Sequence, residues 1–445
     1  MDTHSKIVRI PSDCGDAAAK RGFSAMAKSM TGSSILKISS EIRELLGRGI
    51  DVADMTVGDF STREFPIPAR LTQELLSAVG HGDSNYPPPA GLWELREAVR
   101  QHIARTQNME YPLEAINIVS GGRPTLYSTY RLLVDPGELV LCPVPSWNNH
   151  NYRDTNQCQV LGLLCRPEDA FQPTVDLFRP HLEDARLLVL NTPQNPSGGV
   201  MQRDTVADFG QMLVEENERR EQTGQKPLYL LFDQIYRSLV FPGHQHYSPV
   251  QLVPECAPYV IHTDGISKGL AATGLRCGWM FGPSAITRKL TAFLTHVGAW
   301  APKPVQLATA NFLRDQEAVS AWEIEMIENV RRRLTALRDT IVELKEEGMP
   351  VDFIEPQGAI YMSVQFRLKG MVTATGTTLN NNDDIRSFLL QEANFALVPF
   401  NAFGVAVEYE DGWFRASVGA VGIDTIKAAG PRLKAALSSL KTAAH

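Results

Sequence analysis

Residues 264–283 read DGISKGLAATGLRCGWMFGP, a polar turn followed by a run with the composition of a β-strand, Cys277 to Phe281. The turn carries Lys268, and Arg276 follows eight residues later, just before the strand. Burial and a nearby positive charge both favour the neutral, nucleophilic form of a lysine. A neutral amine condenses with an aldehyde, and a guanidinium binds a phosphate through paired hydrogen bonds. The pattern therefore suits a ligand that carries both an aldehyde and a phosphate.

Pyridoxal phosphate is such a ligand, although a Ser-Lys pair before a glycine is more often part of a solvated loop. The stretch resembles the signature of the fold-type I pyridoxal-phosphate enzymes, specifically the class I/II aminotransferases. The matching motifs, in order, are Ser267-Lys268, Thr273-Gly274 and Arg276-Cys277-Gly278-Trp279. The resemblance extends from about residue 35 to the C-terminus. It implies that Lys268 holds the cofactor as an aldimine and that Ser267 and Arg276 contact it.

Composition sets broad limits on the class of protein. The chain has 445 residues, of which 43% are hydrophobic and 21% are charged, as in ordinary globular proteins. A net charge of −7 argues against nucleic acid or an anionic membrane as the main partner. The six cysteines are scattered, and no apolar run is long enough to span a bilayer. We therefore expect a cytoplasmic protein with reduced thiols, without nucleic-acid or membrane partners, and without a bound metal.

An aspartate and an asparagine close two apolar strands. Asp233 ends the run Tyr229-Leu-Leu-Phe-Asp and is followed by Tyr236, and a buried carboxylate is costly unless a cation meets it. The resemblance implies that Asp233 keeps the pyridine nitrogen protonated and that Tyr236 binds the ring oxygen. Asn195-Pro-Ser-Gly is close to the family motif Asn-Pro-Thr-Gly. It implies that Asn195 contacts both cofactor and substrate, with Asn191 as a second contact.

A glycine turn joins the strand at Ile116 to an apolar helix. Its sequence is Gly121-Gly122-Arg123-Pro124. Free N–H groups and the helix dipole at such a turn attract a phosphate, although many glycine turns are plain connectors. Pro124 lacks an N–H donor, so we expect Arg123 to compensate. Gly122 and Arg123 are accordingly predicted to bind the cofactor.

Trp147, Gly58 and Arg415 complete the predicted site through the resemblance. Trp147 follows a strand and corresponds to the aromatic residue that stacks on the cofactor ring, whereas a plain core tryptophan is the alternative. Gly58 corresponds to a glycine beside the substrate carboxylate. Arg415, in Arg-Ala-Ser, corresponds to the arginine that clamps that carboxylate. Tyr86 corresponds to a tyrosine that reaches the cofactor of the neighbouring subunit, which implies a homodimer.

Strands alternate with helices from Ile116 to Phe281, which predicts an α/β domain with a mostly parallel sheet. By resemblance we expect an aspartate-aminotransferase-like sheet of seven strands and a smaller α+β domain. The expected limits are an N-terminal arm at 1–34, the first part of the small domain at 35–70, the cofactor-binding domain at 71–310, and the rest of the small domain at 311–445.

The resemblance implies an aminotransferase that moves an amino group between an L-amino acid and a 2-oxo acid. The same residues would also serve a pyridoxal-phosphate enzyme of β/γ-elimination, substitution or cyclisation, acting for example on S-adenosylmethionine in a biosynthetic pathway. A transcription regulator with this domain as a sensor is disfavoured, because only about 30 residues precede the resemblance and no basic recognition helix appears. The sequence does not name the substrate side chain.

Overall fold

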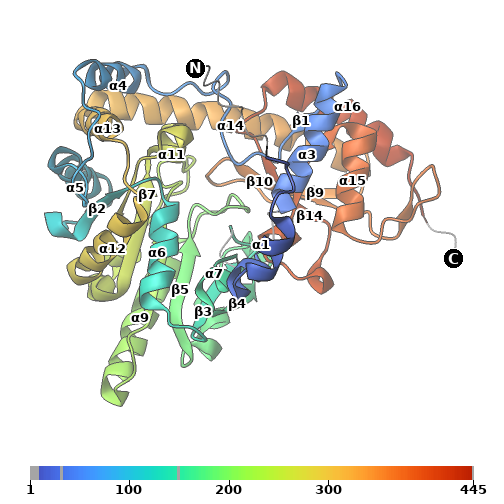
Figure 1. Ribbon diagram of the computed structural model, residues 1–445. Helices are drawn as coiled ribbons and strands as arrows, with labels where there is room; N and C mark the ends of the chain where they lie inside the picture. Colours follow the sequence, from blue (N-terminus) through green and yellow to red (C-terminus); the bar gives the residue numbers. More distant parts are fainter. Residues whose placement is uncertain (1–9, 31–33, 148–150, 443–445) are drawn as a thin grey trace, which may run out of the picture.

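The computed structural model describes residues 10–30, 34–147 and 151–442. They form a larger and a smaller α/β part, and one long helix, α14 (Gln316–Glu346), runs across both (Figure 1). At its two ends α14 packs against different parts, on α13 (Lys303–Arg314) in the larger and on α16 (Ile423–Ser438) in the smaller.

The larger part is built on a seven-stranded sheet. In spatial order its strands are β2 (Ile116–Val119), β8 (Gly278–Phe281), β7 (Val260–Gly265), β6 (Tyr229–Asp233), β5 (Ala185–Asn191), β3 (Leu139–Val144) and β4 (Gln159–Leu164). β8 runs antiparallel to both of its neighbours, and the other neighbouring pairs are parallel. The predicted α/β class with a mostly parallel sheet is confirmed.

Helices cover both faces of this sheet because its central strands are apolar on both sides. In β5, Leu188 and Leu190 belong to the core on one face, and Leu187 and Val189 to the core on the other. The helices on the first face are α4 (Ala69–Gly80), α5 (Trp93–Gln107), α9 (Arg203–Thr223) and α13. Those on the second face are α6 (Arg123–Leu133) and α12 (Ser284–Val297).

The smaller part combines segments from both halves of the chain. Its antiparallel sheet has the order β13 (Val398–Pro399), β14 (Trp413–Ser417), β10 (Tyr361–Phe366) and β9 (Val351–Phe353). A separate parallel pair, β1 (Ala53–Asp54) with β12 (Phe395–Ala396), joins the N-terminal segment to the C-terminal part of the chain. The helices α3 (Ser34–Gly47), α15 (Asn382–Ala393) and α16 complete this part. The domain limits 35–70, 71–310 and 311–445 stay a proposal, and residue 310 lies inside α13.

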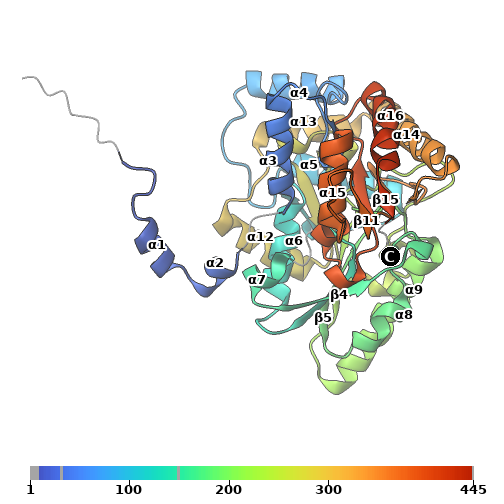
Figure 2. The same cartoon turned by 90° about the vertical axis from the view of Figure 1, so that its right-hand side faces the viewer.

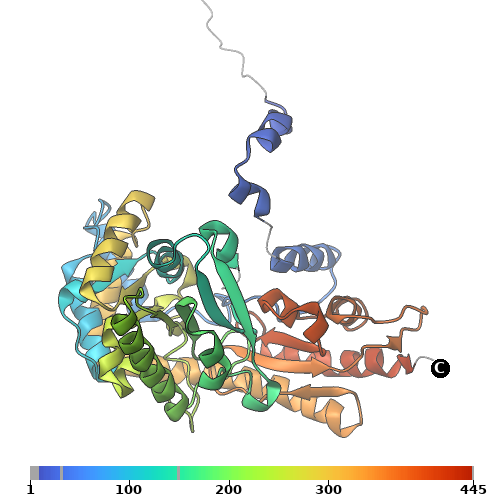
Figure 3. The same cartoon turned by 90° about the horizontal axis from the view of Figure 1, so that it is seen from below.

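Two short helices project from the body of the molecule. They are α1 (Asp16–Gly22) and α2 (Ala25–Ser29), and neither buries a residue (Figures 2 and 3). They lie within the segment predicted as an N-terminal arm. In the described part of the chain, no helix has the length and apolar character needed to cross a membrane. The cysteines are unpaired, and all except Cys14 are buried.

Candidate active site

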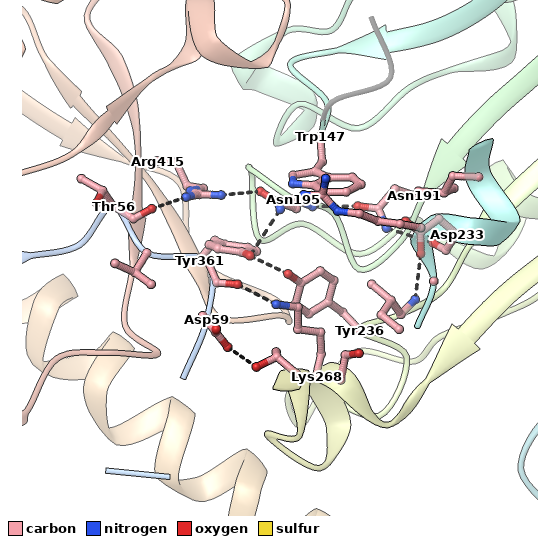
Figure 4. A pocket seen from close by; sticks show the side chains of 18 of the residues that line it. Thr56, Asp59, Trp147, Asn191, Asn195, Asp233, Tyr236, Lys268, Tyr361 and Arg415 are labelled. Atoms are coloured by element: carbon pink, nitrogen blue, oxygen red, sulfur yellow. Dashed lines mark hydrogen bonds between the residues drawn. The ribbon is translucent and has the colours of Figure 1, made fainter. Parts of the chain in front are cut away.

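A cavity of about 550 Å³ opens at the carboxyl ends of β5, β6 and β7. Residues that follow different strands of a parallel sheet converge at such an edge. Every site residue predicted from the sequence lines this cavity except Tyr86. Those that line it are Gly58, Gly122, Arg123, Trp147, Asn195, Asp233, Tyr236, Ser267, Lys268, Arg276 and Arg415. Figure 4 shows Arg415 and Asp233 on opposite sides of the pocket, with Tyr236 between them.

Lys268 reaches into the cavity from the short helix α11 (Ile266–Gly269), which follows β7. Its Nζ donates a hydrogen bond to the Gly58 carbonyl at 2.6 Å. Burial lowers the pKa of the Lys268 ammonium to about 8; Asp59 opposes this shift, and three arginines add to it. A substantial share of the amine is therefore neutral near physiological pH, as a nucleophile requires.

Asp233 lies at the end of β6 with its carboxyl group buried. Burial raises the pKa of this carboxyl to about 7, and the nearby Asp264 acts in the same direction. The Ile235 N–H donates to Oδ1 at 3.1 Å and, together with Lys268, opposes the shift. Asn191 holds the strand end, because its Nδ2 donates to the Asp233 carbonyl at 2.9 Å. The carboxyl group is thus fixed and poised to meet a cation.

A chain of hydrogen bonds links Tyr236 to Arg415 across the cavity. The Tyr236 and Tyr361 hydroxyls are 2.5 Å apart, and Asn195 Nδ2 donates to Tyr361 at 3.3 Å. Arg415 Nη1 donates to Asn195 Oδ1 at 3.1 Å, and Nη2 to the Thr56 carbonyl at 2.5 Å (Figure 4). The Arg415 guanidinium also lies 4.8 Å from the centre of the Tyr361 ring. These contacts hold a positive charge in a buried place where a carboxylate can reach it.

Arg276 lies against the glycine turn that precedes α6. Its Nη2 donates to the Ser120 carbonyl at 3.0 Å, and its Nη1 to the Thr273 carbonyl at 2.7 Å. A Cβ on Gly121, whose φ is +79°, would come within 2.5 Å of Arg276 Nη2. The turn therefore allows the guanidinium to lie directly beside the first residues of α6, where an anion is favoured.

Arg123 and Trp147 pair at the exposed edge of the cavity. The Arg123 guanidinium carbon lies 4.7 Å from the centre of the Trp147 ring. Within the described residues, this contact is accompanied by no hydrogen bond or ion pair of Arg123. The cavity thus keeps a guanidinium available for a ligand.

Tyr86 lies outside the cavity and is 83% exposed. Its ring contacts Trp300 edge to face, with the centroids 5.3 Å apart. Close by in the sequence, Lys303 Nζ forms an ion pair with Asp83 at 2.9 Å. Within one chain these residues do not reach the cavity.

The sequence reasoning missed Tyr361, Asp59 and Thr56. Tyr361 is fully buried in β10 and joins three of the hydrogen bonds and ring contacts described above. Asp59 accepts a hydrogen bond from Thr273 Oγ1 at 2.6 Å, close to Lys268. Asp59 could have been noticed as an acid directly after Gly58, but nothing in the local sequence distinguishes Tyr361 from a core tyrosine.

The residues present fit pyridoxal phosphate. The buried carboxyl of Asp233 suits a ring nitrogen that carries a proton, the Lys268 amine suits the aldehyde, and Arg276 beside α6 suits the phosphate. Arg415 lines the cavity, and its buried Nε has no hydrogen-bond partner among the described residues.

The sequence profile of the family described as aminotransferase class I and II matches residues 50–429. The chain belongs to this family. This aminotransferase is 29% identical over 403 residues to a probable aspartate/prephenate aminotransferase of Thermus aquaticus, covering 88% of this chain and 96% of the relative. It is 28% identical to the aspartate/prephenate aminotransferase of Thermus thermophilus, covering 86% and 93%.

Solved structures agree with this aminotransferase in fold. The aspartate aminotransferase from Rhizobium meliloti superposes with a TM-score of 0.83 at 24% identity, covering 94% of this chain and 99% of that one. The aspartate aminotransferase from Thermus thermophilus with maleate gives 0.82 at 25% identity, covering 94% and 100%. The family uses pyridoxal phosphate, so this chain is a pyridoxal-phosphate-dependent transferase of amino groups. The alternative of elimination, substitution or cyclisation is not favoured.

Proposed function

We propose that this aminotransferase takes its amino group from an acidic L-amino acid, one with a second carboxylate, and passes it to a 2-oxo acid. The observation that carries the proposal is the presence of three guanidinium groups, those of Arg276, Arg415 and Arg123, around one cavity. A cofactor phosphate needs one and a substrate α-carboxylate needs another. The third is then available for a carboxylate on the substrate side chain.

Arg276 is assigned to the cofactor phosphate, and Arg415 to the substrate α-carboxylate. Arg276 lies beside the N-terminus of α6, where phosphate is favoured by the helix dipole and free N–H groups. Arg415 is anchored on the other side of the pocket by Asn195 and Thr56 (Figure 4). Gly58 leaves space beside the guanidinium for the α-carboxylate, because a Cβ at this position would lie 3.4 Å from Arg415 Nη1.

Lys268, Asp233 and Tyr236 act on protons. Bound pyridoxal phosphate supplies a ring that withdraws electrons from the substrate α-carbon. Asp233 would hold the proton on the ring nitrogen, and the Tyr236 hydroxyl would donate to the ring oxygen. Lys268 Nζ, whose pKa is lowered to about 8, would take the α-proton and return it. Trp147 would stack on the ring and exclude water from that face.

Arg123 is the residue that we assign to the side-chain carboxylate. Its guanidinium is free of hydrogen bonds to other described residues and lies at the exposed edge of the cavity, over Trp147. The relatives named aspartate/prephenate aminotransferase support an acidic substrate. The sequence analysis predicted instead that Arg123 binds the cofactor. A substitution of Arg123 would weaken cofactor binding in that case, whereas in our proposal it would change the preference among amino acids.

The test compares Arg123→Leu with the wild-type protein, loaded with pyridoxal phosphate, on L-aspartate, L-alanine and L-phenylalanine with 2-oxoglutarate as acceptor. We expect kcat/KM for aspartate to fall about 100-fold, because losing a charged hydrogen-bonded pair costs about 2.7 kcal/mol. The kcat/KM for alanine should change little. Affinity for pyridoxal phosphate should stay within a few-fold. If the variant loses affinity for the cofactor but keeps its preference among the amino acids, Arg123 binds the cofactor phosphate and the proposal is wrong.

A further inference from the structure

A second buried carboxyl group lies directly behind Asp233. β6 and β7 are parallel neighbours, and Asp233 pairs in register with Thr263. Paired residues of parallel strands point to the same face, so Asp264 points to the opposite one. The core clusters agree, because Leu231 and Ile261 belong to the face under α6, whereas Leu230 and Val260 belong to the face under α5.

Asp264 is held by a buried arginine on that reverse face. Arg237 Nε donates to Asp264 Oδ2 at 3.0 Å, and both side chains are at most 10% exposed. Gln234 Nε2 lies 3.4 Å from the same oxygen, and the Gly265 N–H donates to Oδ1 at 2.7 Å. Burial raises the pKa of the Asp264 carboxyl, and Arg237 opposes that shift. The group is thus oriented and paired, although it does not line the cavity.

His102 on α5 fixes the other side of Arg237. Arg237 Nη2 lies 2.7 Å from His102 Nε2, and a guanidinium can only donate, so Nε2 is the acceptor. Burial, together with Arg237 and Arg105, lowers the pKa of His102 well below its usual value, which keeps the ring neutral. The guanidinium is therefore held between a carboxylate and an imidazole acceptor.

The remaining ionisable groups around the pair come from several elements. His246 stays neutral, because burial lowers its pKa, and Glu323 on α14 lies near Arg237. Those that face Asp233 from the cavity side are Lys268, Tyr152, Tyr236 and Tyr361. Asp264 is the other carboxylate that acts on Asp233 from the described residues.

We propose that Asp264 and Arg237 are positioning residues whose buried charge pair, behind the sheet, sets how strongly Asp233 holds the proton at the far edge of the cofactor ring. This inference rests on the proposed role of Asp233. The negative charge of Asp264 raises the proton affinity of Asp233 across the sheet. The positive charge of Arg237 partly cancels this effect. Neither residue touches the cofactor or the substrate.

The sign of each substitution follows from the remaining charge. Asp264→Asn leaves Arg237 positive and unpaired, which favours the Asp233 carboxylate and lowers its pKa. Arg237→Gln leaves Asp264 unpaired, which raises the pKa of Asp233. This upward shift is smaller, because a buried unpaired Asp264 takes up a proton itself. The double variant removes both charges and returns the pKa toward the wild-type value.

The measurement is the affinity for pyridoxamine phosphate by titration calorimetry across the acid-to-neutral range. This probe carries the ring and phosphate without the aldehyde, so its binding does not require the Lys268 amine to react. Affinity should fall as the pH drops through the pKa of Asp233, because the carboxylate that meets the ring nitrogen is lost. We expect the midpoint to move down by about one unit in Asp264→Asn, equivalent to a tenfold change in the ionised fraction, and up by less in Arg237→Gln.

Arg105→Gln is the matched control, because Arg105 also contacts His102 but is exposed and does not pair with Asp264. It should leave the midpoint unchanged. If the two single variants move the midpoint in the same direction, or the double variant moves it further than either, the pair acts only as a structural tie and the inference is overturned. If the affinity of the wild-type protein for pyridoxamine phosphate does not fall at acid pH, the proposed role of Asp233 is wrong. That result is distinct from one in which only the variants fail to shift the midpoint.

Discussion

At the scale of the residue, Gly121 leaves no room for a side chain beside Arg276. Its φ of +79° lies in the left-handed region, and a Cβ there would meet the Arg276 guanidinium at 2.5 Å. The turn and the arginine are thus mutually dependent. Arg276 can lie in this place before α6 because residue 121 has no side chain.

We predict that Gly121→Ala displaces Arg276 and weakens binding of pyridoxal phosphate by at least about tenfold, or about 1.4 kcal/mol. Gly274→Ala is the control, since Gly274 lies in the same loop as Arg276 with open space around its Cβ position. Cofactor titration followed by absorbance measures both. Equal affinities in the two variants would contradict the account of this turn.

Local chemistry determined which site residues the sequence could reveal. Asp233 ends an apolar strand, where a carboxylate needs a partner, so it was recognisable. Lys268 and Asn195 were recognisable through the motifs Ser-Lys and Asn-Pro-Ser-Gly. Tyr361 was not recognisable, because a tyrosine inside a strand usually packs in a core. Its role depends on Tyr236, 125 residues away along the chain, and only the folded structure brings the two hydroxyls together.

At the scale of the element, the sequence predicts the strands of the large sheet better than their order. β5 and β6 are short apolar runs that local patterns reveal, whereas β4 was not predicted. The position of β2 beside β8, and the antiparallel direction of β8, depend on how the helices between them pack. Likewise, the pairing of β1 with β12 joins residues more than 300 positions apart, which no local pattern encodes.

The C-terminal end of α9 is tied to the sheet by one arginine. Arg220 Nη2 donates to the carbonyls of Leu182 and Ala185 at 2.6 Å each, and Nε donates to Glu216 at 2.6 Å. The side chain is only 4% exposed. The beginning of β5 therefore depends on a charge that is buried and fully paired.

We predict that Arg220→Met lowers the free energy of unfolding by about 3–5 kcal/mol, because it removes the buried cation beside Glu216 and the donor to two buried carbonyls. Arg219 pairs with the same Glu216 at 2.8 Å but is 39% exposed, so Arg219→Met should cost no more than about 1 kcal/mol. Urea denaturation of the two variants measures the difference. Similar losses in both would show that the buried ties of Arg220 add nothing.

At the scale of the whole molecule, Tyr86 raises the question of a second subunit. It is the most exposed large hydrophobic residue of the described chain, and it lies outside its own cavity. The resemblance implies a homodimer, and we propose that Tyr86 completes the cofactor phosphate site of the partner. In that arrangement one active site contains Lys268 of one subunit and Tyr86 of the other.

Subunit mixing tests this arrangement. Homodimers of Lys268→Ala and of Tyr86→Ala should each have low activity. A mixed dimer, formed by joint refolding, contains one site with both native residues, so its activity should recover toward half the wild-type value. Recovery would not occur if Tyr86 served the site of its own chain, because every site would then lack one of the two residues.

The central claim is that Lys268 is the covalent attachment point of pyridoxal phosphate, facing Asp233 across one cavity. The direct measurement is reduction of the cofactor-loaded protein with borohydride, followed by digestion and mass spectrometry. The account predicts a stable pyridoxyl adduct on the peptide that contains Lys268. An adduct on a different lysine, with the Lys268 peptide unmodified, would contradict it.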